Sequence, residues 1–211
     1  MLKKYLARFF CVACAAGMLS SCGDSKAGGT GEFATVFATA NSTNSVVSSD
    51  VATWFDLTTG AAAQPCAANS FPTVTPDNVI LNVTSTAYTP ANTGSSSTIP
   101  ASALSISNVT LTFTPANSAT PALPARFQTQ FASASPSLIV VGSNLVTLQI
   151  VSDDMKNFLA ANLQCSGVLY TYRVSVAMDV VEVNTNRSGT VSLSGNGYLT
   201  VNMADFGDTA K

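Results

Sequence analysis

Residues 170–180 have the clearest pattern in the chain and read Tyr170-Thr171-Tyr172-Arg173-Val174-Ser175-Val176-Ala177-Met178-Asp179-Val180. Large apolar side chains occupy every second position, and polar or small ones lie between them. Because successive side chains of a strand point to opposite faces of a sheet, this alternation predicts a strand with one buried and one solvated face. The alternation then moves to Val181 and Val183, which indicates a β-bulge or the end of strand pairing.

Two earlier stretches repeat the pattern, residues 79–88 and 104–114. In the second, apolar residues alternate with threonines, which predicts a sheet whose solvated face carries hydroxyl groups. Leu104 and Ile106 fit the buried face only if a bulge near Ser107-Asn108 shifts the register.

Shorter apolar runs predict further strands at residues 33–39, 52–57, 127–131, 138–141 and 145–151. Turn residues at 184–189 precede another strand pair. The run Ser194-Gly195-Asn196-Gly197 then predicts either a second tight turn or a strong kink. The end of the chain is therefore typical of an antiparallel meander.

One helix interrupts the strands, at residues 152–163. Ser152 is a favourable N-cap, and two aspartates follow it in the first turn, where the helix dipole favours negative charge. Apolar residues then recur at helical spacing. We expect a short crossover helix between strands of two sheets.

These elements predict an all-β protein, a single antiparallel β-sandwich of about eight to ten strands over residues 33–211. In its strand texture the chain resembles the immunoglobulin-like and fibronectin-like modules of envelope proteins. The cysteine-tryptophan-cysteine spacing of antibody domains is absent, because Trp54 precedes both cysteines of this region. The resemblance therefore carries no functional residues.

The first 21 residues have the composition of an export signal. A basic start precedes an apolar run from about Phe9 to Leu19, and small residues follow. About eleven apolar residues are too few for a transmembrane helix, which needs roughly 20. We therefore expect residues 1–21 to be a cleavable signal peptide.

The end of this signal, Leu19-Ser20-Ser21-Cys22, resembles the lipobox of bacterial lipoproteins. The resemblance implies that Cys22 is the lipidation site and becomes the first residue of the mature protein, which would bind the membrane through its acyl chains. Gly23, rather than aspartate, follows Cys22, and by the sorting habit of this family the outer membrane is the expected location. An ordinary secretory signal with an incidental cysteine is the alternative.

The next residues are glycine-rich, and we expect residues 22–32 to form a flexible lipid tether. Removal of the signal takes away three of the nine basic residues and none of the eleven acidic ones, so the mature net charge is −5. A protein of this charge is not attracted electrostatically to an anionic membrane. Anchoring would depend on the acyl chains alone.

After export and lipidation, Cys66 and Cys165 are the remaining cysteines. In an oxidising compartment the simplest expectation is one structural disulfide between them, with two buried free thiols as the alternative.

Composition limits the chemistry of the chain. It contains no histidine and only 9% charged residues, which excludes a Ser-His-Asp triad and histidine-ligated metals. The isoelectric point of about 4.8 means that the chain is negatively charged at neutral pH, whereas a nucleic-acid-binding face is positively charged. Ser152 and Lys156 are four residues apart, and we interpret them as surface neighbours rather than a catalytic dyad.

Paired carboxylates are the remaining candidates for catalysis or metal binding. Asp179 and Glu182 would lie on opposite faces of a regular strand unless a bulge joins them. Asp205 and Asp208 are weak candidates for a calcium site, with Asp50 and Asp56 as further ligands only if the fold brings them close.

We expect no catalytic residues, cofactor or resident metal. The leading hypothesis is a non-catalytic structural or interaction module in the cell envelope, which binds an envelope protein or an extracellular partner. The alternatives are a carboxylate-dependent hydrolase of envelope or extracellular polysaccharide, and a module that binds calcium or a small ligand.

Overall fold

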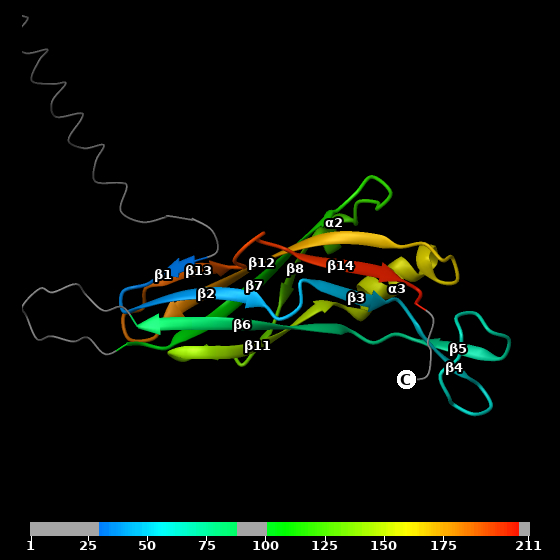
Figure 1. Ribbon diagram of the computed structural model, residues 1–211, viewed down its shortest axis with the longest axis horizontal. Coiled ribbons are helices and arrows are strands. Elements are labelled where there is room, and N and C mark those ends of the chain that lie inside the picture. Colours follow the sequence, from blue (N-terminus) through cyan, green and yellow to red (C-terminus); the bar gives the residue numbers. More distant parts are fainter. Residues whose placement is uncertain (1–29, 88–100, 207–211) are drawn as a thin grey trace, which may run out of the picture.

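The protein is an elongated β-sandwich in a computed structural model that describes residues 30–87 and 101–206 (Figure 1). The first sheet has the order β1-β2-β6-β11-β9. Its strands are β1 (Thr30–Glu32), β2 (Val36–Ser42), β6 (Asp77–Ala87), β11 (Gly142–Val151) and β9 (Ala134–Ser135). The all-β class predicted from the alternation is confirmed.

The second sheet has the order β10-β7-β12-β14-β3, with β8 paired to β7 and β13 paired to β12. Its strands are β10 (Leu138–Ile139), β7 (Leu104–Pro115), β12 (Tyr170–Glu182), β14 (Leu199–Ala204), β3 (Val46–Asp50), β8 (Thr129–Ala132) and β13 (Ser188–Ser192). A separate two-stranded sheet contains β4 (Thr53–Asp56) and β5 (Ser70–Thr73). The described chain thus has more strands than the sequence indicated, and several of them are short.

The core lies between the two large sheets and is formed by the alternating residues that the sequence pointed inward. On β12 the buried positions run from Tyr172 through every second residue to Val180. The central antiparallel pair β7–β12 omits Ser107 from its register, because Asp179 pairs with Asn108 and Val180 with Ile106. This is the predicted bulge, and it keeps both halves of β7 facing the core.

The predicted phase change after Val180 is wrong. Glu182, rather than Val181, continues the buried face of β12, and Val183 is half exposed. The strand therefore stays regular to its end, with a carboxylate in a position where the pattern called for an apolar side chain.

One strand pair departs from the antiparallel arrangement, since β3 and β14 run parallel, with Val46 beside Thr200 and Asp50 beside Ala204. The chain leaves β2 in the first sheet and continues after a short turn as β3 in the second. It therefore enters the second sheet without reversing its direction.

The predicted C-terminal meander is also wrong. Strands β13 and β14 do not pair with each other but lie in succession along the same edge of β12. Between them, Gly195 and Gly197 both have φ of +74°, a conformation that favours glycine. Of the two predicted alternatives, a tight turn or a strong kink, residues 194–197 form the kink. It separates β13 from β14, which otherwise follow each other along one edge of β12.

The segment from residue 125 to residue 139 closes one side of the sandwich. It begins as the short helix α2 (Ala125–Gln128), so the strand expected at 127–131 starts later, as β8. The chain pairs with β7 through β8, with β11 through β9, and with β7 again through β10. The strand expected at 138–141 is short because Asn144 closes the following turn through hydrogen bonds to both backbone polar groups of Val140.

Helix α3 (Asp153–Leu163) is confirmed as a crossover between β11 of the first sheet and β12 of the second. The Ser152 Oγ accepts a hydrogen bond from the Met155 N–H at 3.3 Å, as an N-cap does. Met155, Leu159 and Leu163 are buried beneath the helix. The helix ends beside Cys165, which positions that cysteine for the site described below.

Strand β1 corrects the tether boundary, because Thr30–Glu32 pair with Phe37–Thr39 of β2 although the sequence assigned them to the tether. Phe33 follows β1 and is buried. A Cβ on Gly31 would lie 2.8 Å from the Phe33 ring, and one on Gly189 would lie 3.0 Å from it. Glycine at both positions therefore makes room for this ring.

No helix in the two described ranges has the length and apolar character needed to cross a membrane.

Candidate functional site

The two-stranded β4–β5 sheet and its loops, residues 53–76, form a small lobe at one end of the sandwich (Figure 1). Phe55 and Phe71 pair across the two strands with ring centroids 5.9 Å apart. Most other side chains of the lobe are exposed. The lobe thus has little core of its own, and its attachment to the sandwich has to come from specific contacts.

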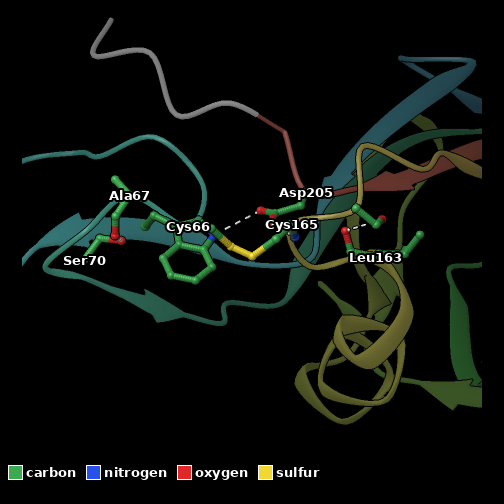
Figure 2. The surroundings of a disulfide bond; sticks show 8 residues. Cys66, Ala67, Ser70, Leu163, Cys165 and Asp205 are labelled. Atoms are coloured by element: carbon green, nitrogen blue, oxygen red, sulfur yellow. Dashed lines mark hydrogen bonds between the residues drawn. A yellow bond between two sulfur atoms is a disulfide. The ribbon is translucent and has the colours of Figure 1, made fainter.

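A disulfide provides the first attachment. In the structure, Cys66 of the β4–β5 loop is bonded to Cys165 at the end of α3, with their Cα atoms 5.9 Å apart (Figure 2). Both cysteines are exposed and both have positive φ, 59° and 58°. The bond joins the lobe to the crossover helix across 99 positions of sequence.

Asp205, which follows β14, supplies the second attachment. Its Oδ1 accepts a hydrogen bond from the Trp54 Nε1–H at 3.0 Å, and its Oδ2 accepts one from the Cys165 N–H at 2.6 Å. Figure 2 shows the carboxylate next to the disulfide. One side chain therefore connects β4 of the lobe, the end of α3 and the end of the second sheet.

The same corner brings three candidate metal ligands together. The Sγ atoms of Cys66 and Cys165 and a carboxylate oxygen of Asp205 lie within 4.8 Å of one another. However, the two sulfurs are bonded to each other, and each carboxylate oxygen of Asp205 already accepts an N–H. The donor set fits a structural clasp better than a metal centre.

Of the calcium candidates, the structure brings Asp50 to the same corner as Asp205, because its Oδ1 accepts the Phe206 N–H at 3.1 Å. Asp56 instead binds the Thr58 and Thr59 N–H groups of its own turn, and these bonds, that of Thr59 first, lower the pKa of its carboxyl. Asp208 lies outside the described residues, so the pairing of Asp205 with Asp208 stays a prediction.

A second polar site lies at the opposite end of the sandwich, around Glu182. Its side chain is fully buried and accepts four hydrogen bonds. The backbone N–H of Ala34 donates to Oε2 at 3.0 Å and that of Thr35 to Oε1 at 2.8 Å. The Thr35 hydroxyl donates to Oε1, and the Thr185 hydroxyl donates to Oε2. The carboxylate thus joins the β1–β2 turn to the β12–β13 turn.

The network extends to a third loop through two buried hydroxyls. The Ser102 N–H donates to the Thr35 Oγ1 at 3.0 Å, and the Asn184 N–H donates to the Ser102 Oγ at 2.9 Å. Burial raises the pKa of Glu182, but the hydrogen bonds from Thr185, Thr35 and Ala34 outweigh it and leave the pKa below its ordinary value. The group is therefore held ionised without an ion pair.

The sequence did not predict this site, because the alternation of β12 was expected to change phase after Val180, which excluded Glu182 from the buried face. The signal was the spacing, since Glu182 is two residues beyond Val180 and in phase with Tyr172. Asp179 points to the opposite, solvated face, where it accepts a hydrogen bond from Thr190 at 3.0 Å. The two acids are not brought together, as expected of a regular strand.

Lys156 corrects the surface-neighbour interpretation. The side chain is only 2% exposed, and its Nζ lies 2.9 Å from the Asp77 Oδ2 at the start of β6. Ser152 uses its hydroxyl oxygen to cap α3. The lysine is thus a buried ion-pair partner that fastens the helix to the first sheet.

Two large aromatic side chains, Trp54 and Tyr172, are buried. Trp54 is 7% exposed, and Tyr172 is fully buried, with its hydroxyl donating to the Pro121 carbonyl at 3.0 Å. Burial, and secondarily the neighbouring Tyr170, raises the pKa of Tyr172 to about 12. Trp54 and Tyr172 therefore belong to the packing of the protein rather than to an exposed platform.

The most exposed large apolar side chain in the described ranges is Phe131 on β8, which is 76% exposed. It borders a shallow groove of about 420 Å³, formed where β8 leaves β7 at the bulge around Ser107. On the same outer face, β7 presents the half-buried Thr110 and Thr112. This surface has hydroxyl and aromatic groups but no carboxylate in the lining of the groove.

Searches of protein-family models, curated proteins and solved structures found no match to this chain.

Proposed function

We propose that this chain is a lipid-anchored protein of the bacterial cell envelope, with a β-sandwich that serves as a non-catalytic structural or interaction module. The observation that carries the proposal is the lipobox-like Leu19-Ser20-Ser21-Cys22 at the end of an export-type signal. Diacylation of Cys22 would attach the mature protein to the outer membrane. The folded module would contact an envelope or extracellular protein.

The shape of the module supports this proposal. Strand β1 and the β4–β5 lobe lie at opposite ends of the long axis (Figure 1). Eight peptide units separate Cys22 from Thr30, a reach of at most about 30 Å. Anchoring at Cys22 would therefore keep the β1 end near the bilayer and present the lobe away from it.

The use of the acidic residues also favours a module over a hydrolase. A glycosidase needs two carboxyl groups about 5–9.5 Å apart beside the scissile bond. Among the described acids, Glu182 and Asp205 both serve as acceptors between loops, and Asp77 pairs with Lys156. These contacts account for the three carboxylates as parts of the framework.

Membrane fractionation of cells expressing Cys22→Ser tests the anchor. We expect the variant to appear in the soluble fraction, while the wild-type protein stays with the outer membrane. Cys14→Ser is the matched control, because it makes the same change inside the signal but outside the lipobox-like sequence. Retention of Cys22→Ser in the membrane, or equal release of both variants, would contradict lipid anchoring at Cys22.

A further inference from the structure

We infer that Glu182 is an acid-sensitive latch, which holds the β1–β2 turn against the second sheet when ionised and releases that turn when protonated. Four hydrogen-bond donors converge on its side chain. Two backbone N–H groups, of Ala34 and Thr35, and two hydroxyls, of Thr35 and Thr185, all point their hydrogens at one carboxylate. Each oxygen accepts two of them.

Protonation of Glu182 disturbs the hydrogen bonds that these donors make. An ionised carboxylate is acceptor-only, whereas a protonated one carries an O–H donor. Protonation of either oxygen of Glu182 places a hydrogen opposite two groups that themselves donate. A hydroxyl can turn and accept this hydrogen, but a backbone N–H cannot reverse its role, and it bonds a neutral acid more weakly than a carboxylate. Protonation therefore weakens the bonds from Ala34 and Thr35 that hold the β1–β2 turn.

No neighbouring cation in the described ranges pairs with Glu182 to compensate this loss. The elements packed around Glu182 are β1, the β1–β2 turn, residues 101–104, β13 and the turn after β12. They contribute two charged side chains, Glu32 and Arg187, and both are exposed. Neither forms an ion pair with Glu182 in the described structure. The state of the latch therefore follows the protonation of Glu182 itself.

If Cys22 is lipidated as proposed, opening of the latch changes how far the module can lie from its anchor. The turn it holds directly follows β1, the first strand described after the tether. With the latch closed, the chain between Cys22 and Thr30 reaches at most about 30 Å. If residues 30–35 join the tether, the reach to Val36 becomes about 50 Å. Acid would thereby let the module move farther from its anchor.

Hydrogen–deuterium exchange of the full mature protein in detergent micelles tests the latch at pH 7, 5 and 3, after correction for the intrinsic pH dependence of exchange. Because the pKa of Glu182 is lowered in the folded protein, we expect protection of the Ala34 and Thr35 amides to fall several-fold between pH 5 and pH 3, while the centres of β7 and β12 stay protected. Glu182→Gln should have low protection at these two amides at every pH. Asp179→Asn, on the exposed face of the same strand, should behave as wild type.

Two results would overturn the inference: protection of Ala34 and Thr35 that does not change with pH, or a loss of protection that occurs equally in β7 and β12. If Glu182→Gln does not fold, Thr35→Val takes its place. That variant removes one hydroxyl donor, so release should occur at a higher pH than in wild type, and an unchanged release pH would contradict the latch. Lipidation is not needed for any of these readings, so the latch and the anchor fail independently.

Discussion

The indole N–H of Trp54 donates to the Oδ1 of Asp205 at 3.0 Å, although 151 positions separate the two residues in the sequence. The contact joins the β4–β5 lobe to the segment that follows the last strand of the sandwich. The same carboxylate accepts the Cys165 N–H beside the disulfide. Trp54 is the single tryptophan of the chain, so its fluorescence reports directly on this corner.

Asp205→Ala should destabilise the corner, because it removes the acceptor of two N–H groups. Loss of such acceptors costs about 1–3 kcal/mol each when the donor is shielded from water. We expect the unfolding free energy, followed by Trp54 fluorescence in urea, to fall by about 2 kcal/mol. Asp205→Asn keeps one acceptor oxygen and should lose less. Equal losses in the two variants would show that the hydrogen bonds are not the cause.

Reduction of the disulfide should loosen the lobe before the sandwich. Removal of a native disulfide costs about 2–5 kcal/mol in small secreted domains. The lobe has little core, so we expect dithiothreitol to shift the Trp54 emission to longer wavelength while the β-sheet circular dichroism is retained. Mass spectrometry of the exported protein without reductant provides the prior check. Two free thiols at Cys66 and Cys165 would refute the disulfide itself.

The Lys156–Asp77 pair predicts an asymmetric set of variants. Asp77→Ala leaves a buried ammonium group without its partner, and breaking a buried pair in this way costs about 3–5 kcal/mol. Lys156→Met keeps the apolar stem and removes the buried charge, so it should cost less. The double variant should be no less stable than Lys156→Met. Additive losses in urea unfolding would mean that the two groups do not interact.

Glu182 predicts a pH dependence of stability. Its pKa is lowered in the folded protein from an ordinary value of 4.5, so the folded state favours the ionised form. The resulting stability is complete well above pH 4.5 and is lost as the pH falls through the lowered pKa. In urea unfolding from pH 7 to pH 3, the stability difference between wild type and Glu182→Gln should therefore shrink. A constant difference would contradict the role of the charge.

The sequence predicted those features that depend on local pattern. The alternation of β12, the bulge at Ser107 and the N-cap at Ser152 each follow from a few neighbouring residues. The buried position of Glu182 could not be predicted in this way. Its burial depends on the Ala34 and Thr35 N–H groups, nearly 150 positions away, which make a carboxylate acceptable in the core.

The lobe and the parallel strand were missed for a related reason. The run at residues 52–57 has the alternation of a strand, but nothing local says that β4 pairs outside the sandwich with β5. Strand β3 was not predicted at all, because Val46 and Val47 are its only large apolar residues, and nothing in this run specifies a parallel neighbour. Strand partners depend on the path of the whole chain rather than on a local pattern.

The central claim, a lipid anchor at Cys22, is tested most directly by mass spectrometry of the N-terminal tryptic peptide from membrane-extracted protein. Trypsin cleaves after Lys26, so the account predicts a peptide spanning residues 22–26, with the mass of the acyl groups added on Cys22. An unmodified Cys22 within a peptide that begins before it, or a mature N-terminus at another residue, would contradict the claim.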